Sequence, residues 1–402
     1  MPRKPRVCIF HTGGTLGMEP GENSEDELIT MDETACPLET MCKDDDDDDD
    51  DENCEPCEVV ERQTTQQETH ARKSKSLEKA TPYDVTLGNY GALEPGNMLD
   101  RLVDRIPQMT TFADLDLYVL FNEDSSNVGP DHWVTIAEEL DARRDEYDAF
   151  ILVHGTDTMA FTASALSLML VGFGKPIVIT GSQLPLGAPR TDARMNLIDS
   201  VSCATNPVLL RAPEVCVCFD GKLLRGNRTQ KVHASSYTAF DSPGVAPLAM
   251  LGVDIVWGEA MLDPASFHDA PYTPRFDLDT RVLRVPVVPG VNPYISYGDC
   301  VERGVRGIVL EVFGVGNMPN CPSSQWLRWL EDQADKGLKV YLTSQCASGD
   351  MRPELYQSGS VALRLGAQGG PRMIPECAVV KLMLCLSNQD VRLSDPIAGE
   401  LG

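Results

Sequence analysis

The sequence predicts an α/β protein. A larger N-terminal domain is expected to contain a doubly wound, mostly parallel sheet of the Rossmann-like kind, with a smaller C-terminal α/β domain behind it. Two observations support this prediction. Short apolar strand patterns alternate with helical patterns about 10–15 residues long, as in parallel sheets with crossover helices. A Pro-, Asp- and Gly-rich stretch then separates two such alternations within the 402 residues. We therefore expect domains at 1–245 and 282–402, joined by a connector at 246–281.

The elements of the N-terminal domain follow from the apolar spacing. Trp133, Ile136, Ala137 and Leu140 recur at helical intervals, which predicts one amphipathic helix. The complete pattern predicts strands over 6–10, 116–121, 150–153, 176–180 and 215–219, and helices over 98–106, 131–145 and 160–171. In folds of this kind, ligands bind beyond the carboxyl ends of the strands.

The C-terminal region shows the same alternation over fewer elements. It begins near Val282 and is expected to hold strands over 307–313 and 339–344, and helices over 324–336 and 377–385.

One segment does not fit a folded core. Residues 21–81 form an acidic, low-complexity insert with an unbroken Asp run at 44–51, and we expect it to be disordered because like charges repel. The formal net charge of −27 argues against binding nucleic acid through its phosphates. We find no apolar run long enough for a membrane-spanning helix, so no membrane partner is expected.

Cysteine usage indicates the compartment. Thirteen cysteines, an odd number, are spread along the chain, which favours reduced thiols in the cytoplasm over a disulfide framework. Four of them fall near the acidic run, namely Cys36, Cys42, Cys54 and Cys57. Only the last pair has CxxC spacing, without a matching second pair, so no metal site is predicted. The N-terminus has no apolar secretory segment.

Three polar turns each follow a predicted strand: Thr12–Thr15, Asp124–Asn127 and His154–Thr158. Because carboxyl ends of parallel strands meet at one sheet edge, the turns can converge on one pocket. Each also has a purely structural reading, as a tight turn with capping residues or as a helix start. Lys231 likewise can be a surface lysine in a basic turn.

Taken together, these segments resemble the bacterial-type L-asparaginases, closest to the cytosolic type I branch. The matching motifs stand in family order over nearly the whole chain outside the insert: HTGGTLGM from His11, DSSNV from Asp124, VHGTDTMAFTASAL from Val153, TGSQLPLGAPRTDARMNL from Thr180, RGNRTQKVHA from Arg225, GVGN from Gly314 and SQCASGDM from Ser344. TGGT and HGTDT after separate strands form the most specific pair.

The resemblance implies a role for each matching residue. Thr15 would be the nucleophile, assisted by Thr156, Asp157 and Lys231. Substrate would be held by Asp124, Ser125, Ser126, Thr156 and Asp157, with Ser182 near the amide end. Tyr90 best matches a tyrosine that completes the nucleophile's hydrogen-bond chain, with Tyr83 as the second choice.

The implied reaction is hydrolysis of L-asparagine by double displacement through a threonine acyl-enzyme, without metal or organic cofactor. A hydroxyl is a weak nucleophile until a base removes its proton, which explains the need for the second group of residues. The resemblance also implies a homodimer or homotetramer in the cytoplasm, in which Asn317 reaches a neighbour's pocket. Preference between asparagine and glutamine stays open.

Two other functions fit the motifs. One is the amidase subunit of a tRNA-dependent amidotransferase, which shares the fold and would pass ammonia to a partner. The other is a non-catalytic amino-acid-binding protein. Within the asparaginase interpretation, the insert lengthens the loop that serves as the active-site lid in relatives. Gln230 and Glu311 replace a threonine and an arginine of the allosteric site of some type I members, so we do not expect activation by asparagine.

Overall fold

The computed structural model describes residues 3–20, 93–95, 102–262 and 271–401. The predicted insert at 21–81, both candidate tyrosines, Tyr83 and Tyr90, and the four cysteines near the acidic run lie outside these residues. Of the helix predicted at 98–106, the described part is α1, Leu102–Arg105.

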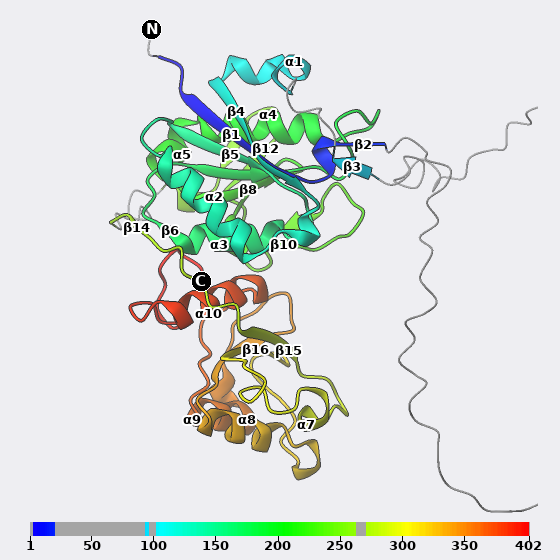
Figure 1. Ribbon diagram of the computed structural model, residues 1–402, viewed down its shortest axis with the longest axis vertical. Helices are drawn as coiled ribbons and strands as arrows, with labels where there is room; N and C mark the ends of the chain where they lie inside the picture. Colours follow the sequence, from blue (N-terminus) through cyan, green and yellow to red (C-terminus); the bar gives the residue numbers. More distant parts are fainter. Residues whose placement is uncertain (1–2, 21–92, 96–101, 263–270, 402) are drawn as a thin grey trace, which may run out of the picture. The chain divides into compact units, whose positions relative to one another are not determined.

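An eight-stranded sheet forms the centre of the N-terminal region, in the order β13-β12-β9-β8-β7-β5-β1-β4 (Figure 1). Neighbouring strands from β4 to β8 run parallel. These five strands span Arg6–Gly13 (β1), Asp114–Glu123 (β4), Ala149–Val153 (β5), Ile177–Thr180 (β7) and Val215–Phe219 (β8). The prediction of a mostly parallel sheet followed by a smaller α/β domain is confirmed.

Both faces of this sheet are covered, which explains the nearly continuous apolar runs of its strands. Successive residues of β1 point to opposite faces: Cys8 and Phe10 pack on one side, Val7 and Ile9 on the other. The first face packs against α2 (Pro130–Ala142) and α3 (Met159–Met169). The second packs against α4 (Ala193–Ala204) and α5 (Pro207–Arg211).

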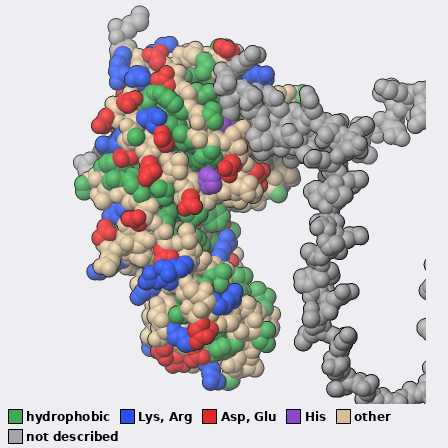
Figure 2. Space-filling model, viewed as in Figure 1, with side chains coloured by type: hydrophobic (Ala, Val, Ile, Leu, Met, Phe, Trp, Pro, Cys, Tyr) green, Lys and Arg blue, Asp and Glu red, His purple; other side chains and the backbone are tan. Residues whose placement is uncertain are grey.

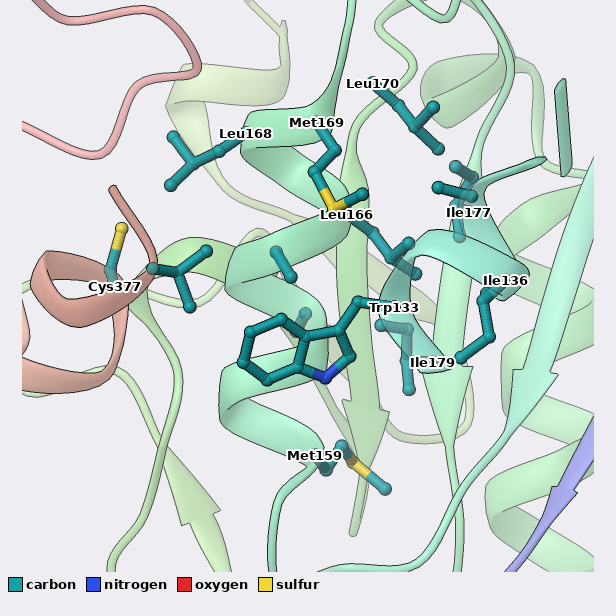
Figure 3. Packing of buried hydrophobic residues seen from close by; sticks show 14 of the residues in the cluster. Trp133, Ile136, Met159, Leu166, Leu168, Met169, Leu170, Ile177, Ile179 and Cys377 are labelled. Atoms are coloured by element: carbon teal, nitrogen blue, oxygen red, sulfur yellow. The ribbon is translucent and has the colours of Figure 1, made fainter. Parts of the chain in front are cut away.

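Trp133 shows how the first face is filled. It is 4% exposed and, as Figure 3 shows, its indole ring lies against α3 in the apolar cluster that contains Ile136 and Met159. The apolar spacing predicted this helix, which in the structure begins at Pro130 and ends at Ala142.

The chain order of the parallel strands places a switch point at β1. The chain runs from β1 to β4 on one side and then continues with β5, β7 and β8 on the other. The crossover connections therefore leave a crevice beyond the carboxyl ends of β1, β4 and β5. The three polar turns follow these three strands.

Beyond β8, the sheet becomes antiparallel. The strands β9 (Lys222–Arg225), β12 (Ala249–Leu251) and β13 (Ile255–Trp257) extend it in succession. Two of them fall inside the stretch expected as a connector, 246–281. With three residues each, they are too short to show a period of two in the sequence.

Further two- or three-residue strands form small ladders away from this sheet. β2 (Met18–Pro20) pairs with β3 (Leu93–Pro95), β6 (Leu170–Val171) with β14 (Thr273–Pro274), and β10 (Gln230–Lys231) with β11 (Phe240–Asp241). The first ladder pairs Pro20 with Leu93, shortly after the turn that carries Thr15.

The C-terminal region contains a parallel sheet of three strands, β15 (Val282–Pro286), β16 (Gly307–Val312) and β17 (Lys339–Ser344). Its separate core includes Trp326 and Trp329 of α8 (Trp326–Asp335), together with Ala362 of α9 (Gln357–Arg364). A short helix, α7 (Pro293–Ser296), precedes β16.

The last helix, α10 (Pro375–Ser387), shares an apolar cluster with α3, which packs on the larger sheet, and with β16 and β17 of the smaller sheet. It also carries Lys381, whose Nζ is fully buried and donates to the equally buried Glu400 carboxylate. Glu400 accepts further hydrogen bonds from the backbone nitrogens of Ile397 and Ala398. The ion pair thereby fixes residues 395–401 against α10.

The surface is mixed in charge. On the face drawn in Figure 2, the Asp and Glu side chains of the described residues are interspersed with Lys and Arg. Among the helices of the described ranges, none has the length and apolar character needed to cross a membrane.

The buried ion pair gives a stability prediction. Glu400→Gln leaves the Lys381 ammonium without a counter-charge, which should lower the free energy of unfolding by about 3–5 kcal/mol in chemical denaturation. The double variant Lys381→Met/Glu400→Gln removes the buried charge and should recover most of the loss. Asp390→Asn serves as the control, because the Arg275–Asp390 pair has a carboxylate 64% exposed and should contribute less than about 1 kcal/mol. Equal losses at positions 390 and 400 would contradict the prediction.

Candidate active site

The turn after β1 depends on two glycines in the left-handed region, Gly13 (φ 109°) and Gly14 (φ 87°). A Cβ on Gly13 would lie 2.0 Å from the carbonyl oxygen of Glu123, so only glycine fits. The Gly14 N–H donates to the same oxygen at 3.1 Å, and the Thr12 hydroxyl donates to Val153 O at 3.0 Å. The turn is thus held to both neighbouring strands, β4 and β5.

The three polar turns meet at Gly155. A Cβ on Gly155 would lie 2.6 Å from Ser125 Oγ and 3.2 Å from Gly14 Cα, so the turns are in van der Waals contact. Hydrogen bonds add to this contact: the Asp157 N–H donates to Ser125 Oγ at 3.2 Å, and the Thr158 hydroxyl donates to Ser125 O at 2.6 Å. The three turns that carry Thr15, Ser125, Thr156 and Asp157 are therefore in contact with one another.

Thr15 follows directly after this contact. It is half-buried and opens a short 3-10 turn, Thr15–Gly17. The next residue, Leu16, is buried in the core and its carbonyl accepts a hydrogen bond from Leu186 N at 3.2 Å. The nucleophile predicted from the sequence is thus anchored between the turn glycines and the loop after β7.

Lys231 reaches the same place from β10. Its Nζ donates to Thr156 Oγ1 at 2.8 Å and to Asp157 Oδ1 at 2.6 Å. The lysine side chain is 19% exposed and the aspartate 64%, so the carboxylate of the pair faces solvent. Thr156 is buried. A hydroxyl, an ammonium and a carboxylate are therefore in direct contact, as the resemblance implied.

The other predicted substrate residues lie around this group. Asp124 is the N-cap of a short 3-10 helix, and its carboxylate accepts from Ser126 N at 2.7 Å. Hydrogen bonds from the side chain and backbone of Ser126 lower the pKa of Asp124. Ser182 is buried and its hydroxyl donates to Leu184 O at 2.6 Å.

Two residues that sequence reasoning did not single out support this site. Gln183 Oε1 lies 3.5 Å from the Thr156 hydroxyl, while its Nε2 donates to Ser236 O at 2.8 Å. Asp192 in turn accepts from the backbone nitrogens of Gln183 and Leu184, at 2.9 and 3.1 Å. Burial raises the pKa of Asp192. Both stand in the segment TGSQLPLGAPRTDARMNL, and only the contacts of Gln183 with Thr156 and Ser236 join residues far apart in sequence.

Positions expected outside the main site also have defined partners. Asn317 Oδ1 accepts from Ser358 Oγ at 2.8 Å. Gln230 Nε2 donates to Glu376 at 2.8 Å. The Glu311 carboxylate accepts from Arg284 Nε at 2.6 Å. The predicted approach of Asn317 to a neighbour's pocket stays a prediction. So does the predicted lack of activation by asparagine, which is based on Gln230 and Glu311.

In the part of the chain that the structure describes, no group of three or more His, Cys, Asp or Glu is arranged to hold a metal ion. The N–H groups of Gly13 and Gly14 already donate to His11 Nε2 and to Glu123 O, so a developing oxyanion would have to be stabilised by other backbone N–H groups of the three turns.

Comparison with known proteins gives the same indication. The family model described as "Asparaginase, N-terminal" matches residues 86–261, and "Glutaminase/Asparaginase C-terminal domain" matches residues 281–393. The L-asparaginase 1 of Escherichia coli is 36% identical over 272 residues, covering 66% of this chain and 76% of that protein. A glutamyl-tRNA(Gln) amidotransferase subunit from Methanopyrus kandleri is 32% identical over 362 residues, covering 82% of this chain and 77% of that protein.

Among solved structures, L-asparaginase I from Vibrio cholerae matches with a TM-score of 0.72 and 25% identity over 100% of both chains. The chain belongs to the asparaginase family. The resemblance to the type I branch is confirmed by these matches, and the family with its L-asparaginase relatives supports an amidohydrolase.

The contact between the turns leads to a test. Gly155→Ala pushes a methyl group into Ser125, and a displacement of the turns by about 1 Å should lower kcat/KM for amide hydrolysis, measured as ammonia release, about a hundredfold. Gly370→Ala is the matched control, since no heavy atom lies within 4 Å of its added Cβ. An alanine at 155 that is as active as the control would show that close packing of the turns is not required.

Proposed function

We propose that the chain hydrolyses L-asparagine to L-aspartate and ammonia, with Thr15 as the nucleophile. The observation that carries the proposal is the contact of Lys231 Nζ with both Thr156 and Asp157, beside the glycine turn that ends in Thr15. No cofactor takes part in this reaction.

Acylation begins when Thr15 Oγ attacks the side-chain amide carbon of asparagine. The C–O bond forms, the hydroxyl proton passes to the departing nitrogen, and the C–N bond breaks to release ammonia. Negative charge on the amide oxygen is stabilised by backbone N–H groups of the three turns other than those of Gly13 and Gly14, which are already paired, and losing one donor costs about 3–4 kcal/mol. Tyr90 is the proposed relay for the hydroxyl proton.

Deacylation uses water in place of the threonine. Water attacks the ester carbon and gives up a proton to the Thr156 hydroxyl, whose own proton passes to Lys231. A proton then passes from Lys231 to the Thr15 oxygen, so that the ester C–O bond breaks and aspartate and the Thr15 hydroxyl are released. Lys231 can accept a proton only as a neutral amine, so its extra proton must first pass to the Asp157 carboxylate and return at the end of the step.

The α-ammonium and α-carboxylate groups of asparagine have complementary partners among these residues. The exposed Asp157 carboxylate suits the α-ammonium of asparagine. Ser125 and Ser126 suit its α-carboxylate, since Ser125 Oγ accepts from Asp157 N and keeps its own proton to donate. Asparagine and glutamine differ by one methylene, worth about 1–3 kcal/mol in a pocket, and Ser182 is proposed to lie near the amide end.

A glutaminase subunit of a tRNA-dependent amidotransferase is the second candidate. The match to the amidotransferase subunit of Methanopyrus kandleri, over 82% of this chain, favours it. Such a subunit would act on glutamine and deliver ammonia to a partner that binds the tRNA.

The test is ammonia release from L-asparagine and from L-glutamine by purified wild type, Thr15→Ala and Thr15→Ser. Wild type without tRNA should prefer asparagine. The alanine variant should lose at least about a thousandfold in kcat/KM, and the serine variant, which keeps a hydroxyl, should retain more. Release from glutamine only in the presence of a partner and tRNA would support the second candidate. Full activity of Thr15→Ala would rule out this nucleophile.

We further propose a homodimer or homotetramer in the cytoplasm, which sedimentation equilibrium and cell fractionation test. Assemblies of this kind would let Asn317 of one copy approach the site of another. The acidic stretch at 21–81 is expected to change access to the site rather than the chemistry.

A further inference from the structure

The turn that carries Thr156 and Asp157 is preceded by a buried histidine. His154 is 1% exposed, and its Nδ1 lies 2.6 Å from the carbonyl oxygen of Gly155. Its Nε2 lies 2.9 Å from Thr162 Oγ1 on α3. The indole Nε1 of Trp133, on α2, donates to the same hydroxyl oxygen at 3.1 Å. A chain of hydrogen bonds therefore runs from α2 through α3 to the turn.

Which atom donates in each of these hydrogen bonds follows from the chemistry of the groups involved. An indole N–H only donates, so Thr162 Oγ1 accepts from Trp133. The Gly155 carbonyl oxygen can only accept, so the proton of the neutral His154 ring resides on Nδ1. Nε2 therefore accepts the proton of the Thr162 hydroxyl. Trp133 and Thr162 hold the ring in this tautomer, which is the one that can donate to the Gly155 carbonyl.

We propose that His154 is a positioning residue of the active site: its Nδ1–H fixes the Gly155–Thr156 peptide and so places Thr156 for its contact with Lys231. The inference rests on the proposed function and adds to it a residue that does not touch the substrate. Trp133 and Thr162 act one step further away, by holding the ring in the required tautomer.

The surroundings keep the ring neutral. Burial lowers the pKa of His154 to about 4, against the opposing effect of its bond to Gly155, and His132 is the nearby titratable group that adds to the lowering. The ring is 1% exposed, and its bond to Thr162 places it beside α3, against which Trp133 packs close to Met159 (Figure 3).

The turn after β1 is held in a related way. His11, also buried, accepts from Gly13 N at Nε2 over 3.1 Å. Burial lowers its pKa to about 4. At both turns a neutral imidazole at the end of a strand binds a backbone group of the following turn. His11 bonds to an N–H and His154 to a carbonyl, so the two need opposite roles of the ring nitrogen.

Asparagine and glutamine substitutions at position 154 test the roles of the two ring nitrogens separately. An asparagine amide nitrogen takes the place of Nδ1 and can still donate to Gly155 O. A glutamine amide extends to the place of Nε2 and can reach Thr162, but leaves the Gly155 carbonyl unpaired. The readouts are kcat and KM for asparagine, the Tm, and amide hydrogen exchange over residues 154–158.

His154→Asn should retain kcat within about threefold, whereas His154→Gln should lose at least about tenfold, with KM changed much less. Exchange at 154–158 should rise only in His154→Gln, and this readout holds whether or not the chain acts on asparagine. Equal kcat and equal exchange in the two variants, with loss of Tm alone, would overturn the proposal and leave the ring a packing element.

A second pair of variants covers the case in which position 154 tolerates neither substitution. Thr162→Ser keeps the hydroxyl and should match wild type in kcat and exchange. Thr162→Val keeps the shape of the side chain but removes the hydroxyl, so His154 Nε2 loses its hydrogen-bond donor. This variant should lower kcat by about threefold to tenfold and raise amide exchange at 154–158. Identical behaviour of the serine and valine variants would show that the hydrogen bond from Thr162 to His154 does not matter for the active site, and would overturn the proposal.

Discussion

The active site of this chain depends on the close contact of three turns that follow neighbouring strands. Gly14, Ser125 and Gly155 approach so closely that an added methyl group at either glycine would overlap another turn. The parallel sheet makes this contact possible, because its switch point at β1 brings the carboxyl ends of three strands together. Thr15, Thr156 and Asp157 acquire their positions from this packing.

Lys231 adds the one group that the sheet itself does not supply. Lys231 lies on β10, which pairs with β11 in a short ladder outside the main sheet. Its side chain donates hydrogen bonds to Thr156 and Asp157 of the third turn. The same region contacts the end of the chain, since Arg228 donates to Glu400 O at 2.7 Å. Packing of the C-terminal segment against α10 therefore supports the segment that carries the lysine.

The sequence was informative where chemistry and periodicity are local. It identified β1, β5, β7 and β8 and the turns after them, and it grouped Thr15, Ser125, Thr156, Asp157 and Lys231 through their motifs. It missed α4, as well as the antiparallel strands β9, β12 and β13, whose lengths of three or four residues carry no clear period. Gln183 contacts Thr156 and Ser236, which are far away in the sequence, and a linear pattern does not reveal such contacts. The bonds of Asp192 and His154 are shorter in range but link turns and helix starts that have no periodic signal.

The central claim is that Lys231 and Thr156 act as one unit, and a double-mutant cycle tests it most directly. kcat/KM for L-asparagine would be measured for wild type, Lys231→Met, Thr156→Val and the double variant. If the two groups act together, the double variant should lose little more activity than the more damaging single variant. A double variant whose loss equals the product of the two single losses would show that the residues work independently, and would contradict this account.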